Sequence, residues 1–171
     1  MLALEEYLRS SYPDGDREFL DGLLVKRKLG APDHSAMQVV LVSHFARLQP
    51  EFAIDVRPSC RIRISDDRYR VPDILVMKVP FRRNKRVILD APLIVVEIVS
   101  PDDRVRDTMQ RFRDYAALGV RNIIQMDPED RTTFVFESGN VISRDLKTLD
   151  LGDGILLPFD TQQLFSQLEE D

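Results

Sequence analysis

The sequence contains only one cysteine, Cys60, which excludes an internal disulfide bond. Its two histidines form no cluster with that cysteine at the spacing of a zinc site. No apolar run approaches the roughly 18 to 20 residues that cross a bilayer, and the first dozen residues lack the pattern of a signal peptide. These absences predict a cytoplasmic protein that folds around a hydrophobic core.

Several common catalytic motifs are also missing. The chain has no glycine-rich phosphate loop, no Gly-x-Ser-x-Gly motif and no His-Glu-x-x-His motif. Cys60 lies in a strand-like segment with no evident activating partner. The sequence also lacks internal repeats, low-complexity segments and linkers, so we expect residues 1–171 to form a single domain.

The net charge of −5 argues against a protein built mainly to coat nucleic acid. It does not exclude a nuclease, because carboxylates that hold cations contribute to an acidic total. Basic residues gather at 26–28, 61–70 and 82–86. These runs are either solvated faces of strands and loops or parts of a track for phosphate groups.

Hydrophobic periodicity and turn signals predict alternating helices and strands. Helices are expected at 3–11, 32–48, 102–118 and 161–168. Strands are expected at 57–65, 69–78, 93–99 and 122–126, with hairpins at 18–28 and 131–141. This order predicts an α/β fold with a mixed sheet, as in α+β proteins. Helices are expected to flank this central β-sheet.

Two carboxylates, Asp73 and Glu97, interrupt apolar rows in the predicted strands. Side chains alternate between the two faces of a strand. The apolar residues on the same faces are Val71, Leu75 and Met77 for Asp73, and Leu93, Val95 and Val99 for Glu97. A buried carboxylate is unfavourable or becomes protonated, and two on adjacent strands repel each other. A divalent cation between them removes both problems, because hard cations prefer oxygen ligands.

A structural role stays open for each acid. Asp73 follows Pro72 and can accept hydrogen bonds from backbone amides, whereas Glu97 can pair with an arginine. Either acid alone favours this structural interpretation, and the two together favour a metal site. A working site needs both carboxylates within about 5 Å of a common point, since metal–oxygen distances are about 2.1 Å.

Two segments carry a resemblance to a known family. Val71-Pro72-Asp73 is followed two dozen residues later by a Glu-x-x-Ser-Pro-x-Asp-Arg pattern that begins at Glu97. This ordered pair resembles the Uma2 family of restriction-endonuclease-like proteins, which belongs to the PD-(D/E)XK nuclease superfamily. Supporting matches between residues 5 and 165 lie at 18–22, 33–34, 115–120 and 126–128.

The resemblance implies a restriction-endonuclease-like core in which Asp73 and Glu97 hold Mg²⁺ or Mn²⁺. The backbone carbonyl of Ile98 would be a further ligand. It also implies hydrolysis of phosphodiester bonds, in DNA rather than RNA, by a water molecule that the ion activates. A homodimer fits this interpretation, because cutting both strands needs two sites.

The chain departs from the superfamily at the position of the catalytic lysine, which is Val99 here. Uma2 proteins commonly move the basic residue to the following helix, where the aligned residue is Arg111. Helical spacing places Arg104, Arg111 and Tyr115 along one edge, so Arg111 can reach towards Glu97. We expect Arg111 to be catalytic and Arg104 to bind substrate, although arginine cannot act as a base. A structural ion pair of Arg111, for example with Glu97, is an equal alternative.

Five other positions near these motifs have a structural or a functional interpretation. His34, at the start of a helix, is either a hydrogen-bonded core residue or a substrate-binding group beside the metal. Many relatives have an acid where this chain has Leu23. Glu18 is either a remaining acid of the site or, as hairpins commonly show, a partner in a salt bridge. Ser100 and Asp103 are predicted to cap the helix that follows the buried strand.

Two functions therefore compete. The first is a Mg²⁺-dependent endonuclease, which the pair Asp73 and Glu97 favours. The second is a catalytically degenerate module that binds nucleic acid or a protein partner without cleavage, which Val99, Arg111, Leu23 and the acidic net charge favour.

Overall fold

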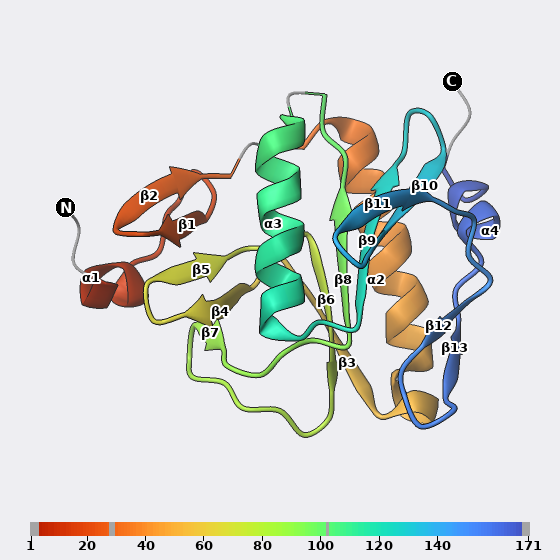
Figure 1. The fold of residues 1–171 in the computed structure, drawn as a ribbon, viewed down its shortest axis with the longest axis horizontal. Coiled ribbons are helices and arrows are strands. Elements are labelled where there is room, and N and C mark those ends of the chain that lie inside the picture. Colours follow the sequence, from red (N-terminus) through yellow and green to blue (C-terminus); the bar gives the residue numbers. More distant parts are fainter. Residues whose placement is uncertain (1–3, 28–29, 102, 169–171) are drawn as a thin grey trace.

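The computed structural model describes residues 4–27, 30–101 and 103–168. Across these ranges the chain forms a six-stranded sheet, a five-stranded sheet, a two-stranded ribbon and four helices. Two of the helices cover opposite faces of the larger sheet (Figure 1). This arrangement confirms the predicted α/β fold with helices on both sides of a mixed sheet.

The larger sheet has the strand order β11-β10-β9-β8-β6-β3. Its strands are β3 (Ile54–Pro58), β6 (Ile74–Lys78), β8 (Ile94–Ile98), β9 (Asn122–Asp127), β10 (Thr132–Glu137) and β11 (Asn140–Ser143). The neighbours β8 and β9 are parallel, and the other pairs are antiparallel. All five residues of β8 are buried, as expected for a strand that is covered on both faces.

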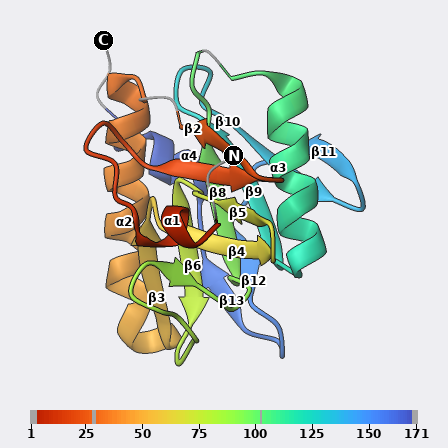
Figure 2. The same cartoon turned by 90° about the vertical axis from the view of Figure 1, so that its left-hand side faces the viewer.

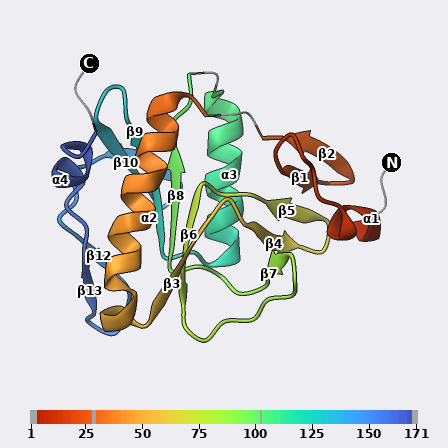
Figure 3. The same ribbon diagram turned by 180° about the vertical axis from the view of Figure 1, so that it is seen from behind.

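Helix α3 (Val105–Leu118) packs on one face of this sheet and helix α2 (Pro32–Phe52) on the other. Figure 1 shows α3 in front of the sheet, and Figure 3 shows α2 in front when the molecule is seen from behind. The even positions of β6 and β8 pack with α2, and Leu75, Met77 and Val95 pack with α3. By the same alternation, positions 73 and 97 belong to the α3 face.

Helix α2 carries the predicted apolar stripe on its buried face, with Met37, Leu41 and Phe45 fully buried. It continues past the predicted end at residue 48 and includes Pro50 in its last turn. The helix ends where Ala53 adopts a left-handed conformation with φ of 50°. None of the helices in the described ranges, α2 included, has the length and apolar character to cross a membrane.

The smaller sheet has the order β2-β1-β5-β4-β7. Its strands are β1 (Arg17–Leu20), β2 (Leu23–Lys26), β4 (Arg61–Ser65), β5 (Arg68–Arg70) and β7 (Val87–Ile88). Figure 2 shows this sheet and helix α1 (Leu4–Arg9) in front of the larger sheet, between α2 and α3. The predicted Asp21-Gly22 hairpin is present, with positive φ at both turn residues.

The predictions of single strands at 57–65 and 69–78 are wrong, because each segment is divided between two strands. The first is divided between β3 and β4, where Ser59 has a positive φ of 48°. The second is divided between β5 and β6 by Val71-Pro72-Asp73, because a proline cannot donate a ladder hydrogen bond. In both cases the two halves lie in different sheets.

The C-terminal region covers the α2 side of the larger sheet. It contains β12 (Thr148–Asp150) and β13 (Leu156–Pro158), which the sequence did not predict, and α4 (Thr161–Phe165), which is shorter than predicted. Phe159 stacks on Phe45 of α2 with ring centroids 5.6 Å apart. The predicted hairpin at 131–141 is confirmed by β10 and β11.

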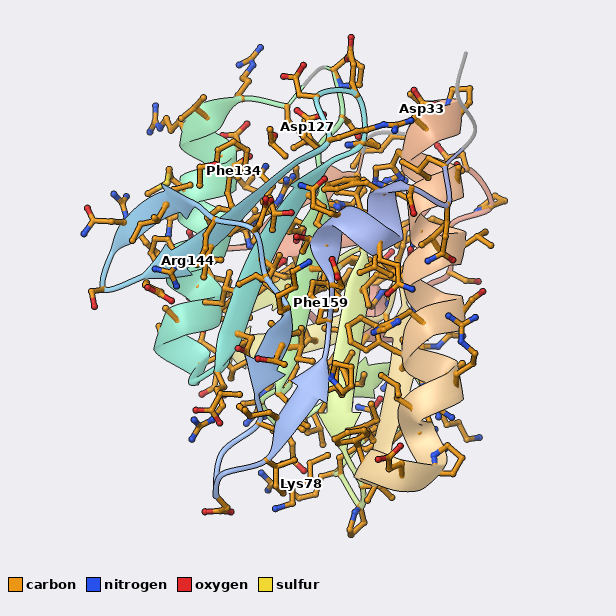
Figure 4. All side chains as sticks on the ribbon, turned by 90° about the vertical axis from the view of Figure 1, so that its right-hand side faces the viewer. Asp33, Lys78, Asp127, Phe134, Arg144 and Phe159 are labelled. Carbon is orange, nitrogen blue, oxygen red and sulfur yellow. The ribbon has the colours of Figure 1, made fainter. Side chains whose placement is uncertain are left out.

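The two ends of the larger sheet carry different residues, and one end carries both candidate acids. Figure 4 shows Asp33, at the start of α2, and Asp127, at the end of β9, at one end of the sheet. Lys78, the last residue of β6, lies at the opposite end. The first of these ends also holds the start of β6 and the end of β8, and hence Asp73 and Glu97.

Candidate active site

Asp73 and Glu97 lie side by side at this end of the sheet. The antiparallel register pairs Ile74 with Val96, and its continuation sets position 73 opposite position 97. Asp73 is 6% exposed and Glu97 is 3% exposed. The sheet therefore holds two carboxylates against each other on its α3 face, away from bulk water.

An arginine that follows β2 lies between these two acids. One nitrogen of Arg27, Nη2, is 2.9 Å from Oδ1 of Asp73 and 3.1 Å from Oε2 of Glu97. Both oxygens are thus within 3.1 Å of one atom, which satisfies the geometric requirement for a shared cation. In this structure the positive charge at that point belongs to the protein itself.

Asp73 is further held by backbone and side-chain donors. The amide of Ile98 donates to Oδ2 over 2.8 Å, and Nε2 of His34 lies 3.3 Å from Oδ1. The carbonyl oxygen of Asp73 accepts a hydrogen bond from Gln38 of α2. Burial raises the pKa of Asp73, but the hydrogen bond from His34, the charge of Arg27 and the Ile98 amide together lower it to about 2.

Glu97 has a different balance of interactions. Its Oε1 accepts a hydrogen bond of 2.5 Å from the hydroxyl of Tyr115 on α3. Burial raises the pKa of Glu97 to about 7, and the negative charge of Asp73 adds to this effect while Arg27 opposes it. Burial and the neighbouring Glu97 also raise the pKa of Tyr115 well above its usual value of 10.0. Arg27 therefore does not fully compensate the two acids.

Arg111 lies close to the acids without pairing with either. Its Nη1 is 3.9 Å from Oδ1 of Asp103, and its charge lowers the pKa of Glu97. Within the described ranges its buried Nε has no hydrogen-bond partner. The alternative in which Glu97 pairs with Arg111 is therefore wrong. Glu97 does pair with an arginine, but that arginine is Arg27.

A pocket of about 120 Å³ opens beside the acids. It is lined by residues of β2, α2, the end of β8 and the start of α3, namely Val25, Lys26, Arg27, His34, Ile98, Ser100, Asp103, Arg104, Asp107 and Arg111. The structure thus brings His34, Arg104 and Arg111 to the same pocket. Arg104 itself is exposed at the N-terminal end of α3.

A larger groove continues from this pocket between the β1–β2 hairpin and α3. It has a volume of about 710 Å³. Six arginines line it, Arg68, Arg70, Arg104, Arg106, Arg111 and Arg113. Figures 1 and 2 show that the β1–β2 hairpin stands beside α3. A strand of phosphates running along the groove would meet mostly positive side chains.

Glu18 belongs to a second buried cluster and not to the pair of acids. Its Oε2 is 2.7 Å from Nη1 of Arg70, and its Oε1 accepts from the amide of Val71 over 3.1 Å. Arg70 also lies 2.6 Å from Asp114 of α3. The predicted salt bridge of Glu18 is confirmed, although its partner lies on β5 and not in the hairpin.

Ser100 and Asp103 do not cap helix α3, which corrects the prediction. The helix begins at Val105, and its N-cap residue Arg104 makes no side-chain capping hydrogen bond. The carboxylate of Asp103 accepts instead from the amide of Ser100 and closes a turn. Residue 102, the predicted helix start, lies outside the described residues.

Val99 and Leu23 are the two positions at which the sequence departs from the expected family pattern. Val99 lines a different pocket, together with Phe112, Asp127 and Phe134. Leu23 is exposed in β2 and lines the arginine groove. Neither residue contributes to the pocket beside the acids.

The chemistry of the donors fits a divalent cation. Two carboxylates offer hard oxygen ligands at a buried point where a positive charge already lies, and Ile98 lines the adjoining pocket. No group of three or more histidine, cysteine, aspartate or glutamate side chains is arranged to hold an ion in the part of the chain that the structure describes. A cation here would therefore depend on the two acids, on backbone oxygen and on water or phosphate.

A mixed sheet that presents paired acids on neighbouring strands defines a protein of the restriction-endonuclease-like fold. The chain belongs to the Uma2 family, described as "putative restriction endonuclease", whose model matches residues 4–166. This confirms the resemblance found in the sequence, and membership of the family supports a nuclease function.

A solved crystal structure agrees with the fold. The chain is similar to the crystal structure of a "putative nuclease belonging to DUF820" from Anabaena variabilis ATCC 29413, with a TM-score of 0.80. The identity is 22%, and the similarity covers 98% of this chain and 99% of that one. A DrdV–DNA complex studied by cryo-electron microscopy gives a TM-score of 0.45 and 15% identity over 80% of this chain and 11% of that one. No curated protein matches the sequence.

Three residues of the site were not predicted, Arg27, Tyr115 and Gln38. Tyr115 was placed on the same helix edge as Arg111, so helical spacing contained its signal. Arg27 was noted only as part of the basic run at 26–28. Its contacts with Asp73 and Glu97 span 46 and 70 residues of sequence, which no local pattern reveals.

Proposed function

We propose that the protein is a Mg²⁺-dependent endonuclease that hydrolyses phosphodiester bonds of DNA. The observation that carries the proposal is the convergence of Asp73 and Glu97, from neighbouring strands, on one buried and positively charged point. In this proposal the two acids hold Mg²⁺ or Mn²⁺, with the backbone carbonyl of Ile98 as a further ligand. The groove lined by arginines is the place for the nucleic acid.

A bound cation would supply a water molecule of lowered pKa and positive charge beside the scissile phosphate. The remaining work falls to side chains. His34 fixes the orientation of the Asp73 carboxylate, and Tyr115 fixes that of Glu97. Arg111 and Arg104, on the wall of the pocket, bind phosphate oxygens and hold the backbone in line for attack.

A second candidate is the catalytically degenerate module that binds nucleic acid without cutting it. Two observations favour it. The position of the superfamily lysine holds Val99, and Arg27 already neutralises part of the charge that a metal ion would neutralise. In that case the arginine groove would still bind DNA, and Asp73 and Glu97 would stabilise the fold.

A metal titration is the first test between these candidates, and absence of Mn²⁺ binding by the wild type would favour the degenerate module. We expect calorimetric Mn²⁺ binding to the wild type that is lost in both Asp73→Asn and Glu97→Gln. Asp33→Asn is a matched control, because Asp33 is an exposed acid at the same end of the sheet. Binding that persists in both site variants would place the ion elsewhere.

The second test of the proposed function is cleavage of supercoiled plasmid DNA in the presence of Mg²⁺. We expect nicking by the wild type and by Asp33→Asn, and none by Asp73→Asn or in the presence of a chelator. Mn²⁺ binding at the two acids without any cleavage of DNA would favour the degenerate module.

We also propose that the chain forms one domain and acts as a homodimer. The family model spans residues 4–166, and the same helix, α3, packs against strands of both sheets, which supports a single domain. The dimer rests on the need for two sites to cut two strands, and sedimentation of the protein with and without a DNA duplex measures it.

A further inference from the structure

Arg27 differs from the other arginines near the site in what it contacts. One terminal nitrogen lies between the two acids, and the side chain is only 17% exposed. Its neighbour Lys26, by contrast, is half exposed and pairs with Asp14 on the protein surface. The guanidinium thus reaches inward from the end of β2 to the one point where both carboxylates converge.

The oxygens that Arg27 contacts are the oxygens that a metal ion would need. They are Oδ1 of Asp73 and Oε2 of Glu97, whereas the other oxygens of the pair face the Ile98 amide and the Tyr115 hydroxyl. A divalent cation and a guanidinium close together in a buried site repel each other strongly. The two cations therefore compete for the same pair of oxygens.

We propose that Arg27 is an internal counter-cation that competes with the metal ion for the two acids and must leave before the ion binds. This inference rests on the proposed function, since it concerns the same metal site. It makes Arg27 a positioning residue that sets the affinity of the site for metal. The site is then neutral enough to fold without metal and is occupied only when metal displaces the arginine.

The pocket beside the acids gives the displaced side chain a place to go. Arg27 already lines it, together with Asp103 and Asp107, which offer carboxylates at a more exposed position. In that position the guanidinium would join Arg104 and Arg111 on the wall where phosphate is expected. The same movement would therefore free the metal site and add a cation to the substrate side.

The test compares Mn²⁺ affinity by calorimetry in the wild type, Arg27→Gln and Lys26→Gln. The two variants lose the same charge at adjacent positions, but only Arg27 contacts the acids. We expect Arg27→Gln to bind Mn²⁺ about tenfold more tightly or better, because a close like charge is removed. Lys26→Gln should stay within about twofold of the wild type, since exposed charges are screened.

The outcomes separate this inference from the proposed function. Binding by the wild type that Arg27→Gln leaves unchanged or weakens overturns the competition and leaves the metal site standing. If Arg27→Gln binds Mn²⁺ tightly and the wild type does not bind it, Arg27 blocks the metal site completely, which supports the inference. Absence of Mn²⁺ binding in every variant overturns both proposals.

A measurement on the wild type covers the case in which Arg27→Gln does not fold. The side-chain Nε–H signal of Arg27 in ¹⁵N NMR is followed during titration with diamagnetic Mg²⁺. We expect the signal to shift and its hydrogen to exchange faster as the site fills, while the signal of Arg70 stays constant. An Arg27 signal that does not change while Mg²⁺ binds overturns the inference.

Discussion

Two clusters of acids and arginines are buried in this protein, and they differ in their balance of charge. In the first, Glu18 and Asp114 contact two arginines, Arg70 and Arg68. In the second, Asp73 and Glu97 contact one, Arg27. The two buried acids of the first cluster are matched by two arginines, although Arg68 also contacts the exposed Asp21, whereas the second cluster leaves a negative charge for another cation.

The two clusters also differ in what surrounds them. Arg70 is only 5% exposed, and Glu18 receives a backbone amide as well as the arginine, so the first cluster, here called the closed cluster, is tightly paired although it lies in the wall of the arginine groove. It ties the hairpin, β5 and α3 together. In the second cluster, here called the open cluster, Arg27 lines the pocket beside the acids, and burial raises the pKa of Glu97 more than Arg27 lowers it. Residue types alone do not distinguish the two clusters, whereas the balance of acids and arginines does.

The largest effect is expected from breaking the closed cluster. Arg70→Ala leaves Glu18 and Asp114 as buried, uncompensated acids and should lower the free energy of unfolding by about 3–5 kcal/mol. Arg27→Gln should lower it by only about 1–2 kcal/mol, because Glu97 can take up a proton. Urea denaturation at pH 7 without metal measures both.

Arg113→Ala is the control for helix α3, because Arg113 is exposed on the same helix. It should change the free energy of unfolding by less than about 0.5 kcal/mol. Equal losses in Arg70→Ala and Arg27→Gln would mean that the two clusters are alike and that both are purely structural.

The next effect is stabilisation by metal, which should act on the open cluster alone. At a Mn²⁺ concentration of about 100 times the dissociation constant, the wild type should gain about 2.7 kcal/mol of stability. Asp73→Asn should gain no stability from Mn²⁺. Glu18→Gln is less stable than the wild type without metal, but Mn²⁺ should stabilise it by the same amount. Thermal melting with Mn²⁺ and then with a chelator measures the gain and its reversal.

A smaller effect is expected in the pH dependence of stability without metal. Burial raises the pKa of Glu97 from 4.5 to about 7 in the folded protein. The folded state therefore binds this proton more tightly than the unfolded state, and the contribution of Glu97 is largest below pH 4.5 and is lost as the pH rises to about 7. The loss is on the order of 2–3 kcal/mol.

Glu97→Gln removes this dependence and is the comparison to make by urea denaturation at pH 5 and pH 7.5. Asp73 does not change the pH dependence between pH 5 and pH 7.5. Its pKa is lowered to about 2, so its contribution to stability is lost only as the pH falls below 3.8. The same slope in Glu97→Gln and in the wild type would show that Glu97 is not the titrating group.

The sequence was informative about the faces of strands and poor at choosing their partners. Alternation of side chains is a local property, and it correctly put Asp73 and Glu97 among residues of the α3 face. The same alternation runs through Ser59 and Pro72 without interruption. Each break therefore looked like continuous strand, although the chain passes there from one sheet to the other.

The candidate site was predictable to the same extent. An acid in an apolar row is a visible contradiction, so both carboxylates could be selected from sequence. Arg27 stands in a run of basic residues where nothing distinguishes it from Lys26, and Asp114 lies on a helix rich in charge. Their roles arise from contacts between distant segments, which only the fold establishes.

The smallest effect sharpens the comparison at a single hydrogen bond. The hydroxyl of Tyr115 donates to Glu97, an acceptor that is charged at high pH, and the hydroxyl of Tyr7 donates to the carbonyl oxygen of Arg17, which is always neutral. Hydrogen bonds to charged acceptors are stronger than those to neutral ones. Tyr115→Phe should therefore lower the free energy of unfolding by about 1 kcal/mol at pH 5 and by about twice as much at pH 7.5. Tyr7→Phe should lower it equally at both pH values. A loss in Tyr115→Phe that does not depend on pH would mean that Glu97 stays protonated throughout, and the open cluster would then carry no charge for a metal ion to meet.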